Sequence, residues 1–369
     1  MAFITTKNYF LSLAALATFL LWGISLANGT VTQLIMASWH GALEDGTDFH
    51  TKYTGLFLLD FPISLLVAFF YFGTNGHDLA YQYFLIDAYS TLQSAFVWLY
   101  VESNRRTEKP RAVNNPIIWG LLWQCFGAAI ALPLYFYNHL HWLGHSQNTQ
   151  GSSVLATTTA ASAAAIPISF IIGAVAPAII GMLPTWLPRA SQAHQMVLAF
   201  WQPDPVWVSI TQAVFTALFA HILIARGRSE ASRWIRASYA LAAVSSATGH
   251  SYATYKALWS GEPGVSWWRM YVPKDLTGIR EGTTLVDGPW LFLQYDLIII
   301  ALSSISWAFL LVKQLLGARE VSTVRLALVF LLGHVIIGPG ATVSLALYWR
   351  ERKLEQNRQV EDLQKKRVY

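Results

Sequence analysis

The feature that most constrains this chain is a series of nearly uncharged apolar runs, each about 20 residues long or longer. A transmembrane helix needs about 20 predominantly apolar residues. Backbone polar groups cannot stay unpaired in hydrocarbon, so such runs fold as helices or as a closed barrel. The runs are continuous rather than alternating, which excludes a barrel. We therefore predict an all-α transmembrane bundle of about eight or nine spans, near 8–28, 54–73, 79–101, 116–137, 164–185, 204–225, 234–258, 288–312 and 323–348.

Charge and cysteine usage support the same class. Only 12% of the residues are charged, against about one quarter in soluble domains. The net charge of +5 comes largely from loops and the tail, where basic residues face anionic lipid; nucleic acid is not indicated as a partner. Cys125 is the sole cysteine, which excludes an internal disulfide. We expect one bundle over 1–349 and a polar, solvated tail helix over 350–369.

Two of the runs and the orientation leave alternatives open. The run near 8–28 resembles a signal peptide, but its long apolar core favours a retained span. Four prolines punctuate the fifth segment, which predicts a kinked or re-entrant helix. Three basic loop clusters do not all fit on one side of nine simple crossings, so the orientation stays open. The membrane expected is that of the endoplasmic reticulum.

Acidic residues inside the apolar runs are the first candidates for chemistry: Asp60, Asp87 and Asp296. An aspartate at the bilayer centre costs roughly 2.5–3.5 kcal/mol, so such residues face the protein interior. The alternative to a catalytic role is an interhelical hydrogen bond or a partner for a buried histidine. An apolar site keeps a carboxyl group protonated and makes it a Brønsted acid. Glu102 lies beside two arginines and is expected at a solvated helix end.

Aromatic and histidine residues supply the second set of candidates. With 16 Trp, 16 Tyr and 20 Phe, most aromatic residues belong to packing and to interfacial belts, including Trp267 and Tyr271. Aromatic faces also stabilise positive charge. His139, His141 and His145 form an HxHxxxH pattern in an expected loop, a weak metal signal; His221, His250 and His334 are either core residues or bases. Cation-stabilising candidates within spans are Trp98, Trp307, Tyr89 and Phe61.

Missing motifs narrow the chemistry further. The chain has no phosphate-binding GxxxxGK[ST] loop, dinucleotide fingerprint, GxSxG elbow or HExxH pattern. It also lacks the spaced aspartates with which membrane prenyltransferases hold diphosphate through Mg²⁺. Any carbocation must therefore be started by protonation, and neither a metal nor an organic cofactor is expected.

The sequence resembles the fungal membrane-bound terpene cyclases of meroterpenoid pathways, the group of the ascofuranone, ascochlorin and macrophorin cyclases. The resemblance rests on chain length, span layout and the segments FLLDFPISLLVAFFYFG at 57–73 and FWQPDPVWVSI at 200–210. It implies an enzyme that protonates a terminal epoxide or alkene of a farnesylated aromatic substrate and closes rings through carbocations. Asp60, Asp87 and Asp296 are then candidates for the acid and its partner.

Two other functions remain compatible with buried acids. A sterol-isomerase-like enzyme also protonates an alkene inside a helical bundle. A transporter would use the aspartates as a proton or substrate relay, but transporters commonly show repeated halves, and no internal repeat is found.

Overall fold

The computed structural model describes residues 6–105, 109–150, 159–222, 228–273, 282–320 and 322–368. Within these ranges the regular structure is helical, apart from an isolated bridge between Ala42 and Asp48. This confirms the predicted all-α class. The helices are α1 (Thr6–Thr18), α2 (Ile24–Ala27), α3 (Thr30–His40), α4 (Phe57–Thr74), α5 (Leu79–Ser103), α6 (Arg111–Asn114), α7 (Pro116–Phe126), α8 (Ala128–Gln150), α9 (Ala160–Phe170), α10 (Ala176–Met182), α11 (Ser191–Trp201), α12 (Asp204–Ile222), α13 (Arg228–Trp259), α14 (Trp267–Tyr271), α15 (Thr284–Glu320), α16 (Thr323–Ile337) and α17 (Pro339–Val368).

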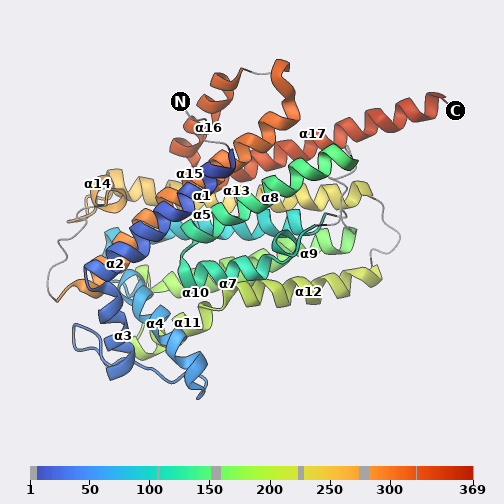
Figure 1. Ribbon diagram of the computed structural model, residues 1–369. Helices are drawn as coiled ribbons and strands as arrows, with labels where there is room; N and C mark the ends of the chain where they lie inside the picture. The colour runs from blue at the N-terminus through green and yellow to red at the C-terminus, as the bar shows by residue number, and fades with distance from the viewer. Residues whose placement is uncertain are drawn as a thin grey trace.

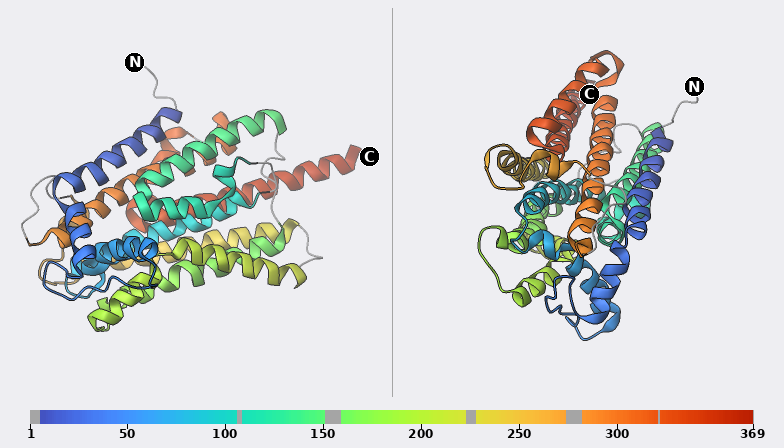
Figure 2. Two further views of the ribbon diagram at one scale, coloured as in Figure 1. Left: turned by 60° about the horizontal axis from the view of Figure 1, so that its bottom comes forward. Right: turned by 90° about the vertical axis from the view of Figure 1, so that its left-hand side faces the viewer.

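Most of the long helices lie side by side with their axes roughly aligned (Figures 1 and 2). Short π-helical turns join α1 to α2 and α9 to α10, so each pair forms one continuous helical segment. The proline-rich fifth segment is therefore a single helical run with an irregular turn in its middle. The C-terminal helix α17 runs without interruption through 349–350, where we placed the start of the tail, and it projects beyond the bundle (Figure 1).

Five of the described helical segments are long and apolar enough to cross a membrane, fewer than the eight or nine predicted. They are Asn8–Ala27, Phe57–Thr74, Ala160–Thr185, Asp204–Ile222 and Thr284–Leu316. The helices α5 and α13 are longer than 18 residues but too polar to meet the same criterion. Most polar side chains of α5 are buried, as are Ser238, Ser246 and His250 of α13, so mean hydropathy underestimates how deeply these parts of the two helices are buried.

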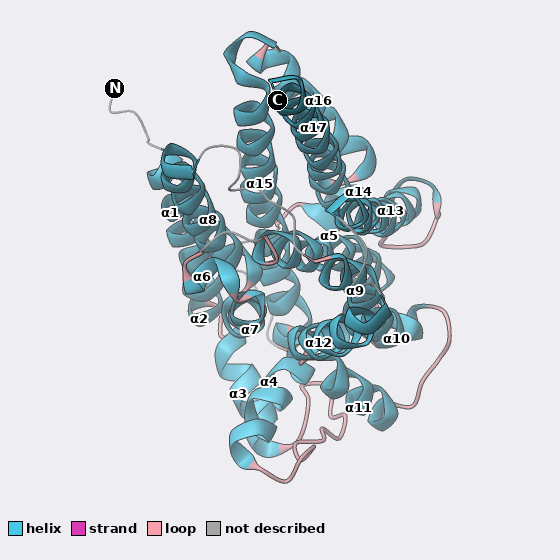
Figure 3. Cartoon of the chain, turned by 90° about the vertical axis from the view of Figure 1, so that its right-hand side faces the viewer, coloured by secondary structure: helices cyan, strands magenta, loops and turns pink. Residues whose placement is uncertain are grey.

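Helix α5 is the centre of the bundle. It packs against α13, α9, α17 and α4, and the end-on view shows it surrounded by other helices (Figure 3). Nearly all of its residues are buried, including the polar seam that the sequence places around Asp87. Because other helices enclose α5, a carboxyl group on α5 can face a cavity inside the protein.

Two predicted continuous spans are broken, each by one glycine. The run at 116–137 divides into α7 and α8 at Gly127, whose φ is +99°. The run at 323–348 divides into α16 and α17 at Gly338, whose φ is +83°. Only glycine adopts such values without strain. Hydropathy does not register these breaks, because the residues on both sides of each glycine are apolar.

The loop expected around the HxHxxxH pattern is also corrected. Helix α8 continues as far as Gln150, and α9 begins at Ala160, so the HxHxxxH pattern lies on a helix and not in a loop. The amide, aromatic and histidine side chains after 138 favour a loop by composition. The N-terminal part of the helix, packed against α1 and α15, provides the apolar contacts that stabilise its continuation.

Candidate active site

Asp87 forms the centre of a buried polar cluster contributed by three helices. Its Oδ2 atom lies 3.0 Å from Nδ1 of His250 on α13. The Tyr271 hydroxyl on α14 donates to the same oxygen over 2.7 Å. Both Asp87 and His250 are at most 4% exposed. This contact is the one expected if a buried aspartate serves as the hydrogen-bond partner of a buried histidine.

The contacts of His250 require one shared proton. Its Nε2 atom lies 3.2 Å from the backbone carbonyl oxygen of Val335, and a carbonyl oxygen can only accept, so Nε2 carries a hydrogen. Either Nδ1 is protonated as well, facing a carboxylate, or Asp87 is protonated and donates to Nδ1. In both cases the Asp87–His250 pair holds a proton that can be transferred.

The pair faces a cavity of about 850 Å³, within the range of small-molecule sites. Its walls come mainly from α15 and α16, and α14 contributes Trp267 as well as Tyr271. His334 also lines the cavity, next to the residue whose carbonyl holds His250. The remaining wall is mainly aliphatic and aromatic, with Gln294 and Ser306 as further polar residues, and includes Tyr9, Phe84, Leu297, Ile298, Ala301, Ile305, Phe309 and Phe330.

A glycine allows the close approach that positions His250. A Cβ atom at Gly338 would lie 2.8 Å from Cγ of the His250 ring, nearer than non-bonded carbon atoms approach. The break between α16 and α17 therefore serves the site. It supplies the Val335 carbonyl on one side and room for the imidazole on the other.

The other predicted site residues do not join this cluster. Asp296 and Tyr89 line a second cavity, of about 410 Å³. The Asp60 carboxylate accepts from the backbone N–H groups of Tyr53, Thr54 and Gly55 and from the Thr54 hydroxyl. These contacts favour a structural role for Asp60, which fixes the loop before α4. Phe61 stacks on Phe57 with ring centroids 5.5 Å apart, and it lines neither cavity.

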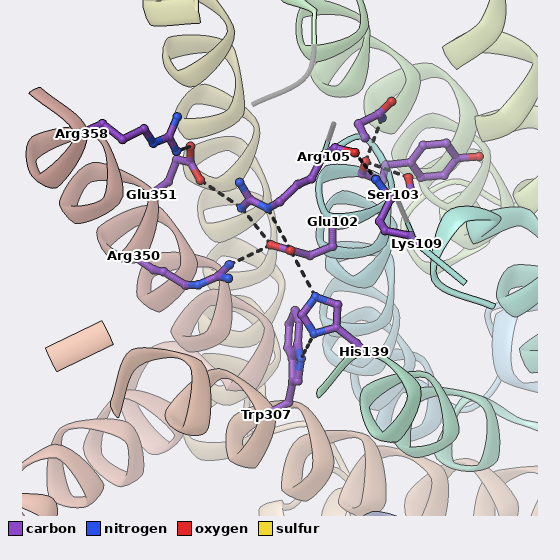
Figure 4. Close-up of polar contacts among 11 residues, drawn as sticks. Glu102, Ser103, Arg105, Lys109, His139, Trp307, Arg350, Glu351 and Arg358 are labelled. Atoms are coloured by element: carbon purple, nitrogen blue, oxygen red, sulfur yellow. Dashed lines mark hydrogen bonds and ion pairs between the residues drawn. The ribbon is translucent and has the colours of Figure 1, made fainter. Parts of the chain in front are cut away.

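Trp307 lies beside a buried ion network (Figure 4), and the ring centroid of Trp98 is 6.3 Å from that of Trp307. The Trp307 indole donates to Nδ1 of His139 over 3.2 Å, so Nε2 of His139 carries the hydrogen and donates to Glu102, also over 3.2 Å. Trp98 is fully buried and donates to Ser344. Neither tryptophan lines the two cavities, so both contribute to packing.

The expectation of a solvated Glu102 is wrong: its exposure is 0%. Arg105 binds both carboxylate oxygens at 2.9 Å, and Arg350 of α17 donates to one of them at 2.8 Å. Arg105 also reaches Glu351 at 3.0 Å. The first residues of the expected solvated tail, Arg350 and Glu351, are therefore buried. Residues 102–105 read as a helix end, but α17 covers this end.

These contacts also bear on the metal site that the HxHxxxH pattern weakly indicates, because they involve its first histidine. Both ring nitrogens of His139 are engaged, which leaves no lone pair for a ligand bond. Over the described residues, no group of three histidine, cysteine or acidic side chains could hold a metal ion.

The sequence singles out Asp87 as a candidate acid, gives no chemical role to Tyr271 and leaves the role of His250 open. Its pattern predicts an interfacial anchor for Tyr271, which stands in a polar connection close to two tryptophans. Its order in the chain gives no signal of its contact with Asp87, 184 residues away. His250 carries a weak signal, a lone histidine in a run of small residues, which is compatible with either a core residue or a base.

An all-helical fold with a buried acid–histidine pair facing a largely apolar cavity suits chemistry on a hydrophobic molecule. The chain belongs to the CtvD domain family, whose sequence profile matches residues 6–354.

Its curated relatives support this class. The chain is 28% identical to the terpene cyclase DEP1 of Fusarium langsethiae over 95% of its own length and 100% of that protein. It is 27% identical to the terpene cyclase alnG of Emericella nidulans, covering 92% of each chain. It is 27% identical to the terpene cyclase ascI of Acremonium egyptiacum, covering 80% of this chain and 77% of that one. No solved structure matches significantly. The predicted resemblance and enzyme class, a terpene cyclase, are confirmed.

Proposed function

We propose that this chain is an integral membrane terpene cyclase that protonates a terminal epoxide or alkene of a farnesylated aromatic precursor. The observation that carries the proposal is the 3.0 Å contact between Asp87 and His250 at the wall of the 850 Å³ cavity, from which we infer a shared proton. An acid in an apolar, water-poor site suits carbocation chemistry, since water would end the cascade early. The named relatives make cyclisation of a terpenoid the expected outcome of that protonation.

The reaction conserves every atom of the substrate. The Asp87–His250 pair transfers its proton to the epoxide oxygen, and the bond from that oxygen to the tertiary carbon breaks. Alkenes of the chain then attack the cationic carbon in turn and close rings. The last cation loses a proton to a base, and His334 lines the same cavity. When an alkene is the group protonated, the proton is added to carbon instead.

The surroundings of Asp87 fit this role. Its Oδ1 atom is buried and has no hydrogen-bond partner among the described residues, so it is available to form a hydrogen bond with a bound molecule. Tyr271 and His250 hold the other oxygen. An unpaired buried acceptor costs about 1–3 kcal/mol, and a hydroxyl or epoxide-derived group of the substrate offsets this cost.

The membrane setting is part of the proposal. The five apolar segments, with the polar inner helices α5 and α13 and the broken pairs α7–α8 and α16–α17, make up the eight or nine crossings. A lipophilic substrate then enters from the bilayer, past the exposed apolar face of α16. We place the enzyme in the endoplasmic reticulum membrane, which fractionation of expressing cells tests.

The deciding experiment is product analysis with microsomes that contain the full chain. They receive a farnesylated phenol or its terminal epoxide, and the variants are Asp87→Asn, His250→Gln and Tyr271→Phe. Loss of a general acid lowers rates by roughly 10²–10⁴-fold, and we expect this range for Asp87→Asn. Asp60→Asn is the matched control, because the same carboxyl is changed outside the cavity; we expect activity within about threefold of wild type.

Heavy water identifies which group is protonated. Alkene protonation in D₂O leaves one deuteron on carbon, whereas epoxide opening places it on an exchangeable hydroxyl. Unaltered substrate from well-folded wild-type protein, with both substrates and several head groups, would reject the proposal. Full activity in Asp87→Asn would reject the assigned acid.

A further inference from the structure

The second cavity has a different chemical character from the first. It holds about 410 Å³ and is lined by Asp296 on α15 together with an unusual share of aromatic residues. No arginine or lysine is among its described lining residues, which argues against a phosphate ligand. The aromatic lining residues are Trp22, Phe69, Phe70, Tyr89, Trp123 and Phe292.

Asp296 is fixed within this cavity. Its Oδ1 atom accepts the backbone N–H of Ala129, in the first turn of α8, over 2.7 Å. This approach requires the break at Gly127, where a Cβ atom would lie 3.2 Å from the same oxygen. The side chain is 5% exposed. A carboxylate oxygen has more than one acceptor direction, so Asp296 can accept a further hydrogen bond from a ligand.

The combination points to a phenol. An aromatic ring gains from offset or edge-to-face packing against other rings, about 0.5–1.5 kcal/mol per pair beyond burial. A phenolic hydroxyl can donate to a carboxyl oxygen of Asp296 in either protonation state of the acid, and the hydrogen bond is charge-assisted when the acid is ionised. A purely aliphatic ligand would fill the space but leave the Asp296 carboxylate without a ligand hydrogen bond.

The two cavities are neighbours. Leu297 on α15 borders both. On α5, Asp87 lines the first cavity, and the next two residues, Ala88 and Tyr89, line the second. The two cavities therefore lie against each other, with Leu297 between them.

We propose that the Asp296 cavity binds the phenolic head of the substrate, and that the isoprenoid chain passes Leu297 to reach the Asp87–His250 pair. The inference rests on the proposed function for its substrate, and it assigns Asp296 to head-group binding rather than to proton transfer. The cavity itself is testable without any turnover.

Cys125 provides a reporter at the site. It is the sole cysteine of the chain, lies exposed and lines the Asp296 cavity. Detergent-solubilised protein is labelled with monobromobimane in the presence of resorcinol at increasing concentration. We expect labelling of wild-type Cys125 to slow at least fivefold at saturation. In Asp296→Asn, which retains an oxygen for the Ala129 N–H, we expect less than twofold protection.

A matched ligand separates hydrogen bonding from simple filling of space. The compound 1,3-dimethoxybenzene has the same ring but no hydroxyl to donate, so it should protect Cys125 less than resorcinol does. Equal protection by the two compounds, equal protection in wild type and Asp296→Asn, or no protection at all overturns the phenol site.

Turnover then tests the link between the cavities. Asp296→Asn should raise KM about tenfold for a farnesylated resorcinol epoxide and leave the headless terminal epoxide of farnesol unchanged. Leu297→Trp should stop turnover of the head-bearing substrate while resorcinol still protects Cys125. Equal loss with both substrates in Asp296→Asn would place Asp296 in the chemistry and overturn the inference. Wild-type protein inactive on both substrates, with Cys125 still protected by resorcinol, would reject the proposed function but retain the phenol site.

Discussion

The Nδ1 atom of His334 is buried at the wall of the larger cavity and has no hydrogen-bond partner among the described residues. A neutral imidazole nitrogen in this position can accept the proton that the last carbocation releases. His334 follows the Asp87–His250 pair in the reaction, so its loss should change which product forms more than how fast the substrate is consumed.

We therefore expect His334→Gln to keep initial consumption within about threefold of wild type and to redistribute the products. Water should trap a larger share of the cation, giving an alcohol one water heavier, or the alkene should form at another position. Mass spectrometry and NMR of the products measure this. An unchanged product ratio in a folded variant would remove His334 from the mechanism.

Also at the scale of single residues, the sequence singles out candidate acids by the free-energy cost of burying a charge. It does not show which groups they contact. Asp60, Asp87 and Asp296 all stand out as acids in apolar runs, and burial of all three is observed. Their environments differ in ways that composition does not encode: a loop of backbone N–H groups for Asp60, a histidine and a tyrosine for Asp87, and the start of α8 for Asp296.

At the level of secondary structure, the two helix breaks shape the two cavities. Gly127 admits the Asp296 carboxylate, and Gly338 admits the His250 ring. The length of each apolar run predicts one helix across each position, because glycine within an apolar transmembrane run is common. Whether the chain continues or turns there depends on contacts with α15 and α13, which lie elsewhere in the sequence.

Gly338→Ala tests this role. Its φ of +83° with a ψ of 162° lies in a region essentially restricted to glycine, which costs an alanine roughly 1–3 kcal/mol, and the added Cβ collides with His250. We expect cyclisation to fall by about tenfold or more, with protein still recovered from membranes. Gly144→Ala, a helical site where a Cβ meets nothing within 4 Å, is the matched control and should retain activity. Similar activity in both variants would argue against a role for the break.

At the scale of the whole molecule, the Glu102 network joins three helices that are far apart in the sequence. Glu102 of α5, His139 of α8 and Arg350 of α17 meet in it, and Figure 4 shows them converging from separate helices. Removing one member of a buried ion pair leaves an uncompensated charge and costs about 3–5 kcal/mol.

Glu102→Gln should therefore lower the thermal midpoint of the detergent-solubilised protein by several degrees and reduce its yield. Arg358→Gln is the control, since the Arg358–Glu351 pair is 3.7 Å long, its arginine is 28% exposed, and Glu351 keeps its 3.0 Å contact with Arg105; solvent screening at the arginine weakens such a pair. Equal midpoints for the two variants, read from tryptophan fluorescence on heating, would show that the network does not stabilise the bundle.

The sequence by itself determined the helical class, the positions of the most apolar segments and the acids worth testing. The free energy of burying a charge or an apolar side chain depends mainly on that residue, so it can be estimated from the sequence. The tertiary structure alone decided which acid meets a histidine, which helices are interrupted and which end of α5 is covered. Tyr271 and His250 reach Asp87 from 184 and 163 residues away. Such pairings depend on how whole helices pack, and a single sequence records the surfaces that pack but not the partner that each surface meets.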